Sequence, residues 1–219
     1  MTEAVSRVWV LLAVWALVGL HLTWPAGIWA QPAETAQVGG VALPLVTPAG
    51  MIRVDGQNAE ADQALERLKL PGIVHLAFYA EQGAWTAFKD GLTQTGPPSL
   101  LDYYAFVTTA ETLADQDLSL TDFDFFKTTT LGQLREMAEA SDMVEIMGDG
   151  PRWLTYRMAM QKTEAGGRVT RAEQITSYVL VQGKILTLTT TGNDRNKFQD
   201  RFRSGALDWR DAYLQETSK

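Results

Sequence analysis

The chain has 219 residues, of which 46% are hydrophobic and 21% are charged, and it contains no cysteine. This composition excludes wholesale disorder, and the lack of thiols excludes disulfide scaffolds, iron–sulfur clusters and cysteine nucleophiles. A formal net charge of −7 argues against nucleic-acid binding, which relies on a basic surface. Because the two histidines are His21 and His75, a multi-histidine metal site or a histidine-based triad is not expected.

Residues 1–30 have the three-part pattern of a secretory signal peptide. An apolar run from Val8 to Leu22 follows Arg7, and Ala30 is the small residue at a predicted cleavage site, with Ile28 acceptable two positions before it. The run is shorter than the roughly 20 residues that a membrane-spanning helix needs, although retention of the segment as an anchor is an open alternative. We therefore expect a periplasmic or secreted protein, which contacts a membrane only if this segment is kept.

Residues 31–50 contain three prolines and the pair Gly39-Gly40, which predict an extended lead-in. No repeat, low-complexity tract or linker divides the chain that follows. Residues 51–219 are therefore expected to form a single domain, and a chain of this length buries enough surface to fold without disulfides.

The first half of this domain alternates between helical and strand patterns. A short strand is expected near Met51–Val54, followed by a helix over Asn58–Leu70. The segment Ile73–Ala80 is apolar on both alternations, which predicts a strand in the middle of a sheet with both faces covered. After a loop at Gly91–Ser99, a second strand is expected over Tyr103–Thr109.

The second half begins with a long helix and continues with closely spaced strands. Ser119 and Asp122 resemble a capping box at the start of a helix that runs to Ala140, and a kink is allowed at residues 128–132. A two-residue loop, Gln182-Gly183, predicts a tight hairpin within a four-stranded antiparallel meander. The meander strands are expected at Met143–Met147, Trp153–Lys162, Arg171–Val181 and Lys184–Thr191, before an amphipathic helix over Asn193–Gln215.

Together these elements predict an α+β domain with a single antiparallel sheet of about six strands and helices packed on it. Their order, and above all the segment Ile175–Thr191 followed by Asp194–Trp209, resembles the Mog1/PsbP-like α/β/α sandwich. The resemblance rests on element order and carries no identifying motif, so it transfers no site. The resemblance implies a non-catalytic function, because members of that fold commonly act as assembly or accessory factors that bind other proteins.

Aromatic side chains are the one unusual feature of the chain. Core packing between the sheet and the helices explains most of them, but a groove lined by some would be a ligand or partner site. The candidates for such a surface are Tyr103, Trp153, Trp209 and Tyr213.

Other patterns indicate ordinary structural roles. His75, on an apolar strand, is expected to be a hydrogen-bonded core or semi-core residue rather than a proton-transfer group. Asp115 and Asp117 resemble the start of a calcium-binding loop. Such a loop requires glycine at its sixth position and glutamate at its twelfth, and these positions are Leu120 and Phe126 here.

Glycines 148 and 150 are not expected to belong to a phosphate-binding loop. The basic cluster on the last helix is expected to be a solvated face, with an acidic partner as the alternative; it comprises Arg195, Lys197, Arg201 and Arg203.

These observations predict a non-enzymatic exported protein without a cofactor or metal, which binds another envelope protein. Two alternatives stay open. One is a small-molecule or lipid carrier with an aromatic-lined pocket of about 300 Å³ or more. The other is a hydrolase that uses two carboxylates, since distant acids can meet in any fold.

Overall fold

The structure is a computed structural model that describes residues 34–57, 59–66, 69–92, 103–163, 169–193 and 199–216. All of these belong to one unit, Glu34–Lys219. The predicted signal peptide at residues 1–30 lies outside the described residues, as does most of the predicted loop Gly91–Ser99. Among the described helices, none has the length and apolar character to cross a membrane.

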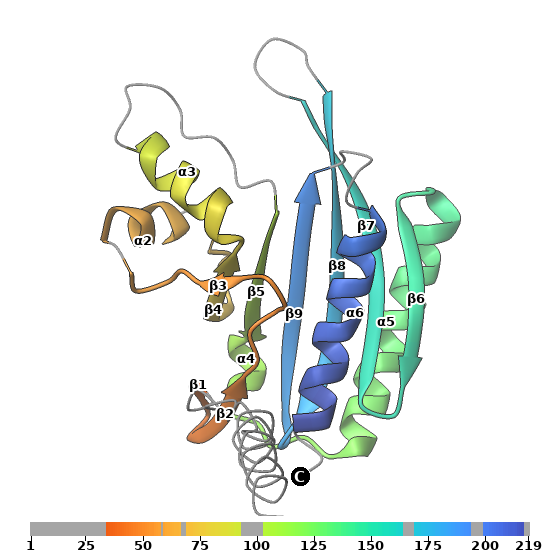
Figure 1. Ribbon diagram of the computed structural model, residues 1–219. Helices are drawn as coiled ribbons and strands as arrows, with labels where there is room; N and C mark the ends of the chain where they lie inside the picture. The colour runs from red at the N-terminus through yellow and green to blue at the C-terminus, as the bar shows by residue number, and fades with distance from the viewer. Residues whose placement is uncertain are drawn as a thin grey trace, which may run out of the picture. The chain divides into compact units, whose positions relative to one another are not determined.

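A large antiparallel sheet forms the centre of the unit (Figure 1). Its strands are β3 (Ile52–Arg53), β4 (Ile73–Ala80), β5 (Tyr103–Ala110), β6 (Val144–Gly150), β7 (Trp153–Thr163), β8 (Val169–Val181) and β9 (Lys184–Asn193). Within the described residues these seven strands pair in the order β3-β4-β5-β9-β8-β7-β6. The predicted α+β class and the C-terminal meander are therefore confirmed, and β4 lies inside the sheet as its sequence indicates.

The expectation of a single sheet of about six strands is wrong, because a separate two-stranded sheet precedes the seven-stranded one. Its strands are β1 (Glu34–Val38) and β2 (Val41–Leu45), within the segment expected to be an extended lead-in. Gly39 and Gly40 form its turn with φ of 52° and 78°. Buried side chains of this hairpin join the main core: Val38, Leu43 and Leu45.

Helices cover both faces of the large sheet. They are α2 (Ala59–Glu66), α3 (Gln82–Leu92), α4 (Glu111–Ala114), α5 (Leu120–Ala140) and α6 (Gln199–Glu216). The predicted capping box is confirmed at α5, where the Ser119 hydroxyl accepts from the Asp122 backbone amide and the Asp122 carboxylate accepts from the Ser119 backbone. The helix continues through residues 128–132 without a break. Helix α3 was not predicted, and its Trp85 and Phe88 are buried.

The two faces of the sheet are covered differently (Figure 1). On one face, α6 packs its apolar stripe on β8 and β9, and its Trp209 meets Tyr79 of β4 edge to face. On the opposite face, α5 covers the β6–β8 end, and Leu134 is buried there against Leu154. Near the β3–β5 end of that same face, α3 packs Trp85 in a cluster with Phe78.

Candidate ligand-binding site

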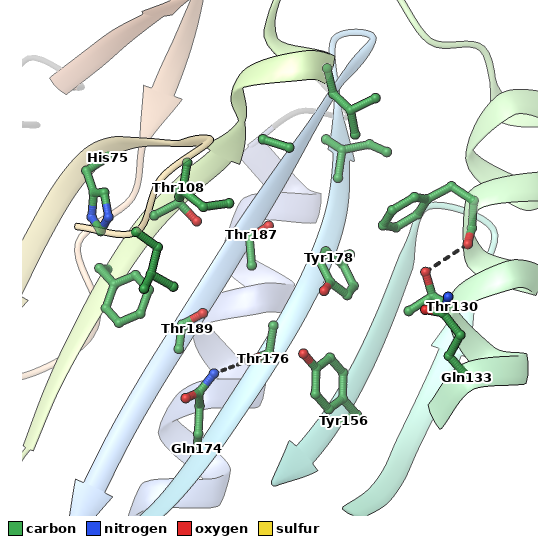
Figure 2. A pocket seen from close by; sticks show the side chains of 17 residues that line it. His75, Thr108, Thr130, Gln133, Tyr156, Gln174, Thr176, Tyr178, Thr187 and Thr189 are labelled. Carbon is green, nitrogen blue, oxygen red and sulfur yellow. Dashed lines mark hydrogen bonds between the residues drawn. The ribbon is translucent and has the colours of Figure 1, made fainter. Parts of the chain in front are cut away.

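A half-open pocket of about 460 Å³ lies on the face of the sheet between α5 and the β4–β5 end. This volume falls in the range of small-molecule sites. The lining comes from five strands, from α5, and from one residue each of α4 and of the segment before β4, and Figure 2 shows its polar and aromatic side chains together. The lining residues are Leu70, Ile73, His75, Phe106, Thr108, Ala110, Leu113, Phe126, Thr130, Gln133, Tyr156, Gln174, Thr176, Tyr178, Ile185, Thr187 and Thr189.

The strand alternation of β9 explains why threonines form the floor of this pocket. Leu186 and Leu188 are buried in the core cluster that contains Trp209 of α6, so their neighbours point to the other face. Those neighbours are Thr187 and Thr189. The local sequence Leu-Thr-Leu-Thr therefore gives one strand an apolar face toward α6 and a hydroxyl-bearing face toward the pocket.

Pairing between strands arranges the pocket residues in two rows across the sheet. One row runs His75–Thr108–Thr187–Tyr178 over β4, β5, β9 and β8. The next row runs Phe106–Thr189–Thr176–Tyr156 over β5, β9, β8 and β7. In each row two threonines lie between two rings, and directly paired residues on one face of a sheet are in contact distance. The floor is thus a threonine stripe with aromatic side chains on both sides.

Packing holds the aromatic walls in place. Tyr178 meets Phe126 of α5 edge to face at a centroid distance of 5.1 Å and lies 6.0 Å from the ring of Tyr156. On the other wall, the rings of His75 and Phe106 lie 5.9 Å apart. Because these rings contact one another on each side, the walls are built before any ligand enters.

The charge of the pocket is its most distinctive chemical property. Among the described residues that line it, none is aspartate, glutamate, lysine or arginine, although 21% of the chain is charged. Burial raises the pKa of the Tyr178 phenol above its ordinary value, so this hydroxyl stays neutral. The pocket therefore offers hydroxyl, amide and ring groups, and no ion-pair partner for a charged ligand.

His75 lies at the boundary of this pocket and a second one of about 310 Å³, whose lining includes Asp55, Asp62 and Lys69. Burial lowers the pKa of the imidazole, and the nearby charge of Lys69 lowers it further. Its Nε2 atom is buried and has no hydrogen-bond partner among the described residues. The expectation of a hydrogen-bonded histidine is therefore wrong for this atom, because the charged side chains nearby act on the ring without a hydrogen bond to Nε2.

The four aromatic residues proposed from the sequence lie on the opposite face of the sheet. Trp209 and Tyr213 are buried with exposures of 3% and 0%, and the Trp209 indole donates to the Val46 carbonyl. Tyr103 is half-buried against Phe202.

Trp153 is also half-buried, beneath the Arg210 guanidinium at 3.9 Å from the ring centroid. These four residues thus take part in packing between the sheet and α6, the first explanation that their sequence pattern suggested. The structure does not bring them to the pocket.

The basic cluster expected on the last helix lies only partly within the described residues. Arg195 and Lys197 lie outside the described residues, whereas the guanidinium of Arg203 lies 3.8 Å from the Glu145 carboxylate. In the described ranges, no three histidine or acidic side chains form a group that could hold a metal ion. Comparison of the sequence with protein-family models and with curated proteins finds no match.

The sequence did contain a signal for the pocket, in the alternating threonines of β9 and the matching polar positions of β8. That pattern alone also fits a sheet face open to water. What it could not indicate is that Thr108, Thr176 and Thr189 are only 2–4% exposed, because aromatic rings from distant strands enclose them.

Proposed function

We propose that the protein is an exported, non-enzymatic binding protein that holds a small uncharged molecule in this pocket. The observation that supports the proposal is a pocket of about 460 Å³ whose lining carries no acidic or basic side chain. A charged ligand would lose its hydration on entry and find no counter-charge, at a cost of several kcal/mol. A neutral molecule with an apolar body meets no such penalty.

The chemistry of the lining favours binding over catalysis. A two-carboxylate hydrolysis needs paired acids beside the substrate, and the described lining residues supply none. His75 reaches the pocket without a carboxylate beside it in that lining to orient it as a general base. Delivery to, or binding of, another envelope protein remains part of the proposal, because export and the resemblance in element order both favour an accessory role.

A matched pair of fluorescent probes tests this proposal. N-phenyl-1-naphthylamine is neutral, and 8-anilinonaphthalene-1-sulfonate adds a sulfonate to the same skeleton. We expect the neutral probe to bind with one site per chain and the anionic probe to bind at least about 10-fold more weakly, a difference of about 1.4 kcal/mol.

The control for this test is a variant with a filled pocket. Thr187 is half-buried on the pocket floor, so Thr187→Trp places an indole in the space that a ligand would use. Binding of the neutral probe should be lost in this variant while the circular dichroism spectrum is kept. Equal binding of both probes, or unchanged binding by Thr187→Trp, would contradict the proposal.

For the fold, we propose the Mog1/PsbP-like sandwich as the finer assignment within the α+β class. Support comes from the antiparallel meander β6–β9, the long helix α5 before it and the closing helix α6 after it. An experimental structure superposed on members of that group would test the assignment, and a different strand order in those members would overturn it.

A further inference from the structure

The spacing of the two residue rows in the pocket indicates which shape of ligand fits there. Adjacent strands are about 4.8 Å apart, so the two ring-bearing residues of a row are separated by about 14 Å between Cα atoms, three strand spacings. Successive rows are about 7 Å apart along the strands. The threonine stripe is therefore the floor of a trough between two aromatic walls, and the floor residues Thr176 and Thr189 are 2% exposed.

The walls of the trough favour a ring. His75 and Phe106 form one wall, and Tyr156 and Tyr178 form the other. Aromatic side chains contact flat ring systems through offset stacking or edge-to-face packing, which contributes beyond simple area burial. A flat molecule that lies over the threonines meets rings on both sides at once.

The floor of the trough favours a ligand that forms hydrogen bonds. Each threonine hydroxyl is one donor and two acceptor positions, and the Gln174 amide already donates to the Thr176 hydroxyl at 3.1 Å. A purely aliphatic chain would remove water from the other hydroxyls and pair with none of them, which costs free energy for each buried group. A neutral hydroxyl or carbonyl oxygen on the ligand would replace the lost water.

Resting on the proposed function, we infer that the ligand is a flat, uncharged ring compound with a hydroxyl or carbonyl oxygen. The threonine stripe, chiefly Thr187 and Thr189, recognises this oxygen by hydrogen bonding, while the aromatic walls hold the ring. The two threonines are thus specificity-determining residues: they distinguish an oxygen-bearing ring from the same ring without oxygen, as sites built to bind a polar group generally do.

Competition against bound N-phenyl-1-naphthylamine at pH 7 tests this inference. The competitors are 2-naphthol and 2-methylnaphthalene, which have the same ring system and differ in a hydroxyl against a methyl group. We expect 2-naphthol to bind about 2- to 12-fold more tightly, the gain of one net hydrogen bond. The variants Thr187→Val and Thr189→Val keep the shape of the side chain and remove its hydroxyl.

In at least one of these variants, or in the double variant, the ratio of the affinity for 2-naphthol to that for 2-methylnaphthalene should fall to about 1. The affinity for 2-methylnaphthalene itself should stay unchanged. Thr191→Val is the matched control, because Thr191 is buried on the same strand and face and does not itself line the pocket, although its partner Gln174 does. Its preference should equal that of the wild type. Thr108→Val, on β5, serves as an additional test if a β9 variant is unstable.

The outcomes separate the two proposals. Equal affinity of the wild type for the two competitors, or a preference that survives all the valine variants, overturns the inference and leaves the binding function standing. Failure of N-phenyl-1-naphthylamine to bind overturns the proposed function and this inference with it.

Discussion

His75 shows how one residue responds to the environment of the pocket. Burial and the charge of Lys69 lower its pKa below the usual 6.5, while Glu66 acts in the opposite direction. The folded protein therefore binds fewer protons than the unfolded chain when the pH lies below 6.5. The contribution of the neutral ring to stability is complete above this pH and decreases as the solution is acidified.

We predict that the free energy of unfolding of the wild type falls more steeply between pH 6.5 and 5.5 than that of His75→Gln. Urea denaturation at a series of pH values measures both slopes, and the other titrating groups, including His21, are common to the two proteins. Parallel slopes in the two proteins would show that the imidazole is not held neutral by its surroundings.

At the scale of single residues, the sequence indicated polar positions but not which of them would be enclosed. Thr187 and Thr189 alternate with leucines, which predicts their face correctly. The rings in the row of the buried Thr189 come from Phe106 and Tyr156, which are 83 and 33 positions away from it in the chain. Such long-range pairing has no local signal, so the pocket could not be predicted from the residues alone.

Among the elements, the β1–β2 hairpin depends most on one glycine. A Cβ atom at Gly39 would lie 2.2 Å from the Ala114 carbonyl oxygen and 2.9 Å from the Lys184 ammonium nitrogen. The Lys184 side chain is 1% exposed, and its ammonium donates to the Gln116 carbonyl and pairs with the Asp117 carboxylate. The turn of the hairpin thus packs closely on the segment between α4 and α5.

We predict that Gly39→Ala destabilises the protein by more than Gly40→Ala. Both positions have a positive φ, which costs an alanine about 1–2 kcal/mol. A Cβ atom at Gly40 meets nothing within 4 Å, so that variant measures the backbone strain alone. Chemical denaturation of the two variants gives the difference, and equal losses would show that the contact with Ala114 is not made.

Elements with a clear local pattern were predictable, and those without one were not. The capping box at Ser119 and the two-residue loop at Gln182-Gly183 both form as the sequence indicates, because their signals are local. The hairpin was missed because Pro44 argues against a strand, yet proline is tolerated in a two-stranded sheet, where every strand is an edge. Helix α3 was missed because Gly83 and Gly91 interrupt its short apolar pattern.

For the whole molecule, the order of elements was sufficient to predict the class and the meander. It was not sufficient to predict which part of the sheet the helices would leave uncovered. That depends on where the helices end: α5 covers β6–β8 and α3 packs near β4, while the pocket lies between them. The candidate site is thus a consequence of helix placement over a face that carries threonines.

The most direct test of the proposed function is native mass spectrometry of the protein purified gently from its own cells. We expect a bound mass of a few hundred daltons on the wild type that is absent from Thr187→Trp, on a polypeptide that begins at Gln31 if the predicted signal peptide is removed. A wild-type protein that carries only its polypeptide mass, or a bound mass that Thr187→Trp retains in full, would contradict the assignment of this pocket as the binding site.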